Sequence, residues 1–92
     1  MDTIGARLRY ARDAADCSAT ALAALAGLSP AHVGMIERGD RFRLAYPTVS
    51  RLARVLGVST DWLADGIGPD PDPAAVRAAV EAARAAAPQV AA

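Results

Sequence analysis

The chain of 92 residues has no lysine, one cysteine, one histidine and few aromatic residues. The lone cysteine, Cys17, excludes an internal disulfide and a cysteine metal cluster, and we interpret it as a small buried thiol. One histidine leaves no histidine metal site and no spare partners for an assisted nucleophile. No apolar run approaches the roughly 18 residues that span a bilayer, and no signal-peptide pattern opens the chain. We therefore expect a cytoplasmic protein with no membrane association, no metal, no cofactor and no enzymatic activity.

The charged residues balance, because ten arginines stand against ten acidic residues. A general nucleic-acid coat would be more basic, so DNA binding here must depend on local clustering. Such a cluster lies between Arg38 and Arg54, where five arginines accompany one acidic residue, Asp40. The sequence thus permits an interface with an anionic partner on one part of the surface.

Apolar spacing and capping residues predict five short helices within residues 1–66. The first follows a cap at Asp2 or Thr3 and carries Ile4, Leu8, Ala11 and Ala15 at helical spacing. The other four are predicted to start at Ser18, Ser29, about Thr48 and Ser59, and to end at Gly27, Gly39, Gly57 and Gly66. The second and third helices, joined by the short turn 27–29, form a helix-turn-helix.

The remaining residues divide into a linker, 67–73, and an alanine-rich tail, 74–92. Each proline of the linker disfavours helix at the residue before it, so we expect a stiff extended segment with solvated aspartates. High alanine content favours helix over residues 74–87. Its apolar stripe, which includes Val76 and Val80, is too thin to hold a core. We therefore expect either a frayed tail or a helix that docks on a second protein chain.

Four stretches occur in order with family-like separations: "IGARLRYAR", "LAALAGLS", "IERG" and "LARVLGVSTDWLADG". With them, residues 4–66 resemble the phage-repressor and Cro-like helix-turn-helix domains, also called the XRE type. The resemblance implies a five-helix domain that binds operator DNA as a dimer, with the third helix in the major groove. The expected fold class is all-α: a five-helix repressor-like domain plus an alanine-rich C-terminal helix or tail.

The resemblance also implies an ion pair between Arg12 and Glu37, which would fix the third helix against the first. The base-reading positions of the family correspond to Pro30, Ala31, His32 and Met35 in this sequence. None of these offers the bidentate contact that arginine gives guanine or glutamine gives adenine. Ala31 and Met35 are expected to touch thymine methyl groups, His32 to make a single hydrogen bond, and Gly34 to allow close approach of the backbone.

Affinity must then come from contacts with the DNA backbone. Ala19 stands where the family often has a glutamine that grips a phosphate. The expected phosphate contacts are the arginines near the end of the third helix and the amides at three helix starts: Arg38, Arg41, Arg43, Ser18, Ser29 and Thr48. The predicted function is sequence-specific transcription regulation by a homodimer on a two-fold symmetric site. The alternative is a protein-interaction or assembly module that keeps the fold but has lost base reading.

Overall fold

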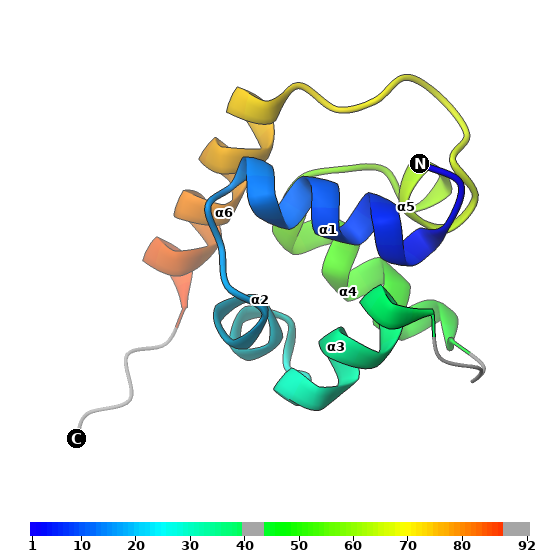
Figure 1. Cartoon of the computed structure of the whole chain (residues 1–92). Helices are drawn as coiled ribbons and strands as arrows, with labels where there is room; N and C mark the ends of the chain where they lie inside the picture. The colour runs from blue at the N-terminus through cyan, green and yellow to red at the C-terminus, as the bar shows by residue number, and fades with distance from the viewer. Residues whose placement is uncertain (40–43, 88–92) are drawn as a thin grey trace.

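The computed structural model describes residues 1–39 and 44–87, and all regular structure within these ranges is helical (Figure 1). The helices are α1 (Ile4–Ala14), α2 (Ala19–Ala26), α3 (Pro30–Arg38), α4 (Tyr46–Leu56), α5 (Thr60–Asp65) and α6 (Pro73–Ala86). Helices α1 to α5 correspond to the five helices predicted within residues 1–66, and α6 lies in the alanine-rich segment. The all-α fold class is therefore confirmed.

Short hydroxyl side chains begin four of these helices where the sequence predicted caps. The hydroxyl oxygen of Thr3 accepts a hydrogen bond from the amide of Ala6 at 3.0 Å. Ser18, Ser29 and Ser59 accept the equivalent bond, each from the amide three residues further along the chain. Each bond satisfies an amide that the first turn of a helix otherwise leaves without a partner.

The start of α4 differs from its prediction. The helix begins at Tyr46 after an Ala45 cap that makes no side-chain hydrogen bond, and Pro47 lies in its first turn. Proline suits that turn, since its missing amide would have had no helical partner and its φ angle is already helical. The amide of Thr48 donates to the carbonyl of Ala45 at 3.1 Å. The helix therefore starts two residues before the predicted start at about Thr48, because Pro47 suits its first turn.

Helices α2 and α3 form a bent pair with 115° between them. The turn is possible because Gly27 has φ 72°, in the left-handed region that favours glycine. The amide of Leu28 then donates to the carbonyl of Ala23 at 2.8 Å and closes the end of α2. Two short helices joined in this way form a helix-turn-helix. No single described helix is long and apolar enough to cross a membrane, although this bent pair passes by length and composition.

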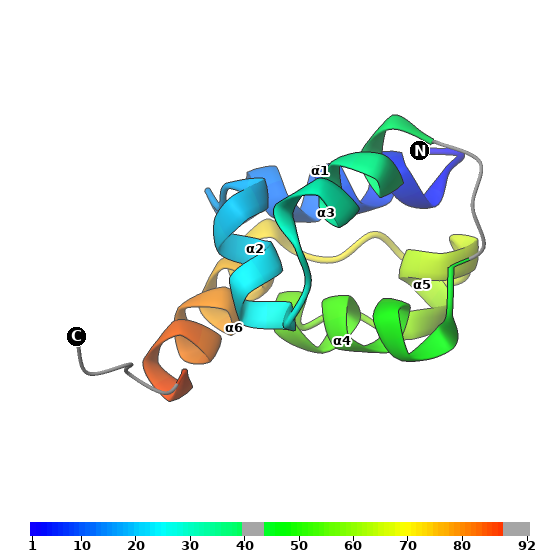
Figure 2. The same ribbon diagram turned by 90° about the horizontal axis from the view of Figure 1, so that it is seen from below.

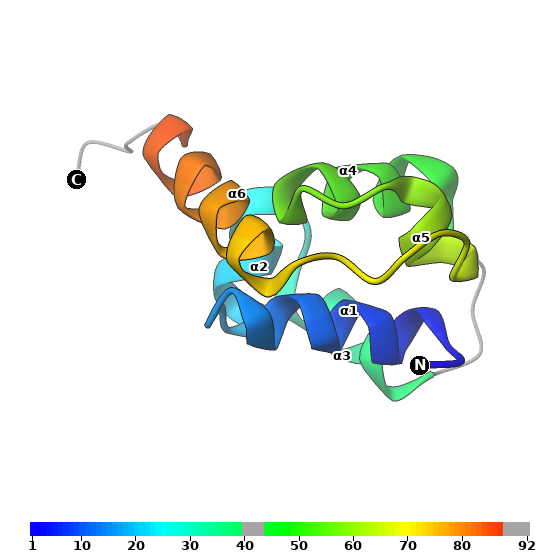
Figure 3. The same cartoon turned by 90° about the horizontal axis from the view of Figure 1, so that it is seen from above.

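The core lies between two layers of helices. Figures 2 and 3 show α1 and α3 on one side and α4 and α5 on the other, with α2 crossing one end. The largest fully buried side chains are Leu8, Leu22, Val33, Leu52, Leu56, Leu63, Val76 and Val80. Trp62 closes the core between α5 and α1, with its ring edge-on to Tyr10 at a centroid distance of 6.2 Å. The aliphatic core agrees with the low aromatic content of the sequence.

Helix α6 corrects the expectation of a tail that cannot hold a core. Val76 and Val80 are both 0% exposed and belong to the same apolar cluster as the rest of the core. The helix packs against α1 and α4, as Figure 3 also shows. Two valines are enough to join α6 to the core, because small residues let α6 come close to the end of α4. A Cβ on Gly57 would lie 2.5 Å from the Cβ of Ala79. The valine stripe is therefore occupied by this chain and is not open to a second one.

The predicted linker, residues 67–73, is also held by side-chain contacts. Trp62 donates from Nε1 to a carboxylate oxygen of Asp70 at 3.1 Å. Asp72 accepts from the amide of Ala74 and so caps α6, which begins at Pro73. The hydroxyl of Tyr10 donates to the carbonyl of Pro71 at 3.4 Å. The expectation of merely solvated aspartates is wrong, because both carboxylates bind neighbouring donors.

Candidate nucleic-acid interface

The third helix is held close against the first at one glycine. A Cβ on Gly5 would lie against the carbonyl oxygens of Ile36 and Glu37, 2.8 Å from the latter. Backbone atoms cannot move aside as a flexible side chain can, so a larger residue here would push the two helices apart. Gly5 therefore sets the distance between α1 and α3.

Arg12 and Glu37 join the same two helices by a two-point ion pair. Arg12 Nε lies 2.8 Å from Glu37 Oε2 and Arg12 Nη2 lies 2.9 Å from Glu37 Oε1. Arg12 Nη1 also donates to the carbonyl of Cys17 at 3.1 Å. The two side chains are only 16% and 10% exposed. The hydrogen bond to Glu37 raises the pKa of Arg12 above its ordinary value, although burial acts in the opposite direction.

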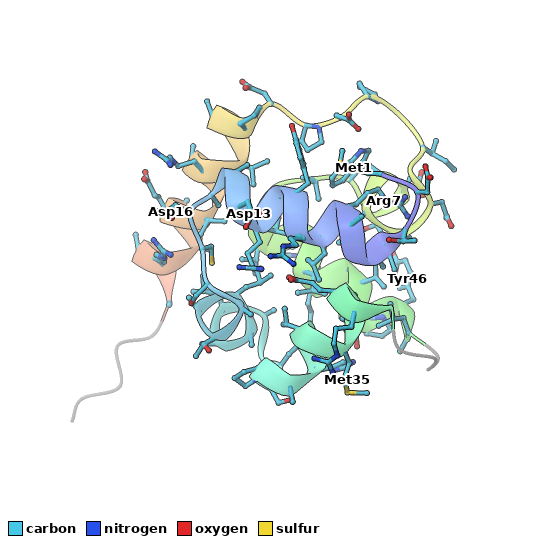
Figure 4. All side chains as sticks on the ribbon, in the orientation of Figure 1. Met1, Arg7, Asp13, Asp16, Met35 and Tyr46 are labelled. Carbon is cyan, nitrogen blue, oxygen red and sulfur yellow. The ribbon has the colours of Figure 1, made fainter. Side chains whose placement is uncertain are left out.

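The outer side of α3 is small and largely apolar. Val33 and Ile36 point into the core, whereas Ala31 and Arg38 are exposed and Met35 is half-buried. Figure 4 shows the Met35 side chain directed away from the body of the molecule. His32 is also half-buried. The structure thus places the three predicted base-reading residues on one short helix, two of them partly covered.

Gly34 leaves room for the Arg38 side chain along this side of α3. A Cβ at Gly34 would lie 3.0 Å from Nη1 of Arg38, so the guanidinium lies over the glycine one turn back. Arg38 is thereby held along the surface of α3 rather than extended from its end. The charge of Arg38, predicted as a phosphate contact, therefore lies over Gly34.

The predicted phosphate contacts at the starts of three helices have few free donors. The hydroxyl oxygens of Ser18 and Ser29 are engaged in capping. At α3, Pro30 has no amide hydrogen and the amide of His32 donates to Ser29, so few donors remain for an anion. Thr48 lies inside the first turn of α4 and its amide is engaged. Two of the predicted phosphate contacts, Arg41 and Arg43, lie outside the described residues.

One buried arginine, Arg7, was given no role in the sequence analysis. Arg7 is only 5% exposed. It donates from Nε to the carbonyl of Leu63 and from Nη2 to that of Ala64, both at 2.8 Å, and from Nη1 to that of Met1 at 3.1 Å. The first two carbonyls belong to the last turn of α5, where a helix leaves acceptors unpaired and its dipole favours a cation. No acidic residue lies three or four positions from Arg7, so the sequence gave no sign that this arginine is buried and bound.

The exposed α3, its turn from α2 and its bracing against α1 define a helix-turn-helix domain. The sequence model of the helix-turn-helix family matches residues 8–63, which is more than half of the chain. The chain belongs to the XRE-type helix-turn-helix family, a family of DNA-binding regulators without enzymatic activity. Searches of curated proteins and of solved structures found no match.

Proposed function

We propose that this protein is a sequence-specific transcription regulator, acting as a repressor, that binds a two-fold symmetric operator with α3 in the major groove. The observation that supports this proposal most directly is the mounting of α3. Its inner residues are buried, its outer side is available, and Gly5 and the Arg12–Glu37 pair fix its position on α1. A helix must be held rigidly to read bases, since hydrogen bonds and close apolar packing tolerate displacements of only a fraction of an ångström.

The readout proposed for α3 depends on shape and on methyl groups. Ala31 and Met35 present apolar surface that suits the methyl group of thymine, and His32 offers one hydrogen bond. None of them forms the bidentate pairs that discriminate most strongly between bases. Sequence-dependent groove shape and DNA stiffness would then supply a larger share of specificity than usual.

Affinity would come from arginines near the C-terminal end of α3. Arg38 is exposed, with its guanidinium over Gly34, and the chain continues into the segment that carries Arg41 and Arg43. Three phosphate contacts per subunit would make the binding constant fall steeply as salt is added. In a homodimer the two α3 helices would lie about 34 Å apart, one helical turn of DNA.

Selection of bound sequences from a random duplex pool tests this proposal. We expect an enriched sequence with two inverted half-sites about 10 base pairs apart, rich in thymine steps. Replacement of Met35 by alanine should relax the preference at one position of each half-site. Arg77→Ala on α6 is the control, because this exposed residue lies on a helix packed against α1 and α4.

A second function is favoured by one observation, the weak polarity of the outer side of α3. It is an assembly module that keeps the fold without reading bases. The two functions give opposite results in the same assay: the module binds no duplex even at low salt and enriches no sequence. Helix α6 packs against α1 and α4 and not over the outer side of α3. This arrangement favours the regulator, because α6 leaves α3 accessible to DNA.

A further inference from the structure

A groove lies between the C-terminal half of α2 and the outer side of α4. Its volume is about 360 Å³, and it is lined by Leu25, Gly27, Arg51, Arg54, Val55 and neighbouring alanines of α2. Leu25 and Val55 are half-buried, so they form an apolar floor that the solvent still reaches. A hollow of this size accommodates one or two apolar side chains.

The wall of the groove on α4 is positively charged. Arg51 and Arg54 are both exposed and three residues apart, so they lie on the same side of the helix. Among the residues that the structure describes, neither has an ion pair or a side-chain hydrogen bond. Two guanidinium groups on one side of a groove match the planar geometry of carboxylates or phosphates.

The C-terminal end of α2, which lines the groove, also has backbone acceptors. The turn after α2 uses the carbonyls of Ala23 and Ala24, which accept from the amides of Gly27 and Leu28. The next two carbonyls, of Leu25 and Ala26, receive no hydrogen bond from any described residue. Such carbonyls at the end of a helix remain available to water or to a ligand that brings N–H donors, and they carry a partial negative charge.

We propose that this groove binds an acidic peptide segment of a partner protein. The segment places an apolar side chain over Leu25 and Val55, carboxylates on Arg51 and Arg54, and backbone N–H groups on the free carbonyls of α2. A nucleic-acid backbone fits less well, because a phosphodiester neither covers an apolar floor nor donates hydrogen bonds to carbonyls. The proposal does not depend on DNA binding, since the groove belongs to α2 and α4 and not to the outer side of α3.

The test uses a displayed library of random heptapeptides, selected on the full chain. We expect enrichment of peptides with two or more acidic residues around a leucine, isoleucine or phenylalanine. The double variant Arg51→Gln, Arg54→Gln should weaken the enriched peptide roughly tenfold or more, because it removes charge-assisted hydrogen bonds. The matched control, Arg77→Gln with Arg84→Gln, removes two exposed arginines from α6 and should leave binding unchanged.

Amide resonances locate the binding and separate it from DNA binding. Addition of the enriched peptide should shift the amides of Leu25, Gly27 and Val55. Absence of an enriched acidic motif, or equal binding by the Arg51, Arg54 variant, overturns the proposal. If a random duplex shifts these three amides and displaces the peptide, the groove is a nucleic-acid surface and the proposal is also overturned. Failure of operator selection, in contrast, leaves the peptide result unaffected.

Discussion

Two arginines of α1 are structural rather than exposed, and they bind different partners. Arg7 donates to three backbone carbonyls, two of them in the last turn of α5. Arg12, five residues later, pairs with Glu37 on α3. A guanidinium suits both sites because its five donors diverge in one plane and it remains charged when partly buried. Through these residues α1 positions both α5 and α3.

Removal of the Arg7 guanidinium should destabilise the fold strongly. We expect Arg7→Met to lower the free energy of unfolding by about 2–4 kcal/mol, because three carbonyls lose a charged donor in a buried site. Arg7→Lys should lose less, since one compact ammonium can still reach one or two of them. Urea unfolding followed by circular dichroism measures both. An Arg7→Met variant as stable as the wild type would show that water replaces the guanidinium without cost.

Replacing one residue of the Arg12–Glu37 pair should destabilise the protein more than replacing both. We expect Arg12→Met to lower the free energy of unfolding by about 3–5 kcal/mol, because a largely buried carboxylate is left alone. The double variant Arg12→Met, Glu37→Met should be less destabilised than the single one, since no charge remains unpaired. If the double variant is destabilised as much as Arg12→Met or more, the two residues are not coupled and the prediction fails.

The pH dependence of this pair follows from the raised pKa of Arg12, which the hydrogen bond to Glu37 causes. A cation with a raised folded-state pKa stabilises the protein fully below its unfolded-state pKa, and this contribution is lost as pH rises through the folded-state value. Since arginine titrates far above neutral pH, the Arg12 contribution should stay constant from neutral into mildly alkaline solution. Unfolding curves of wild type and Arg12→Met over that range should differ by a constant free energy.

At the scale of elements, the α1–α3 contact depends on a residue without a side chain. Gly5→Ala should destabilise the protein and weaken DNA binding, because its Cβ meets the carbonyls of Ile36 and Glu37. Gly34→Ala is a matched control: the same gain in helix propensity, about 1 kcal/mol, applies, but its Cβ meets only the flexible end of Arg38. Thermal unfolding should therefore show a lower midpoint for Gly5→Ala and an unchanged or higher one for Gly34→Ala. Equal midpoints would contradict the close approach of α1 and α3.

Helix α6 should contribute to stability as part of the core. Val80→Ala removes two buried methyl groups, and we expect it to lower the free energy of unfolding by about 1–3 kcal/mol. Arg77→Ala, on the exposed side of the same helix, should change it by less than about 0.5 kcal/mol. Denaturant titration distinguishes the two. Val80→Ala with wild-type stability would show that α6 does not pack on α1 and α4 in solution.

At the scale of the whole molecule, zero net charge leaves DNA affinity to a local group of arginines. We expect Arg41→Ala with Arg43→Ala to reduce the slope of log binding constant against log salt by about 0.9 for each phosphate that the variant no longer neutralises. The control is Arg77→Ala with Arg84→Ala, which removes equal charge from α6. Fluorescence anisotropy with a random duplex measures both slopes. An unchanged slope for the first variant would remove this segment from the contact surface.

Much of the local structure could be predicted because its causes are local. The hydroxyl caps at Ser18, Ser29 and Ser59 and the left-handed glycine at Gly27 depend on residues within one turn of each other. The start of α4 was predicted two residues late, since Pro47 competes with Thr48 for the same role and a single sequence does not rank them. Arg12 and Glu37 were paired only through the family resemblance, as nothing in their spacing of 25 residues suggests contact.

The sequence alone determined that five helices are present, how four of them begin, the order of the helix-turn-helix and the family to which the chain belongs. These features follow from backbone hydrogen bonds and apolar spacing, which act over a few residues. Only the tertiary structure decided that Arg7 is buried on α5, that Gly5 sets the distance between α1 and α3 and that Val76 and Val80 complete the core. Each of these depends on which surfaces meet, because burial and close contact are properties of two elements together and not of either one.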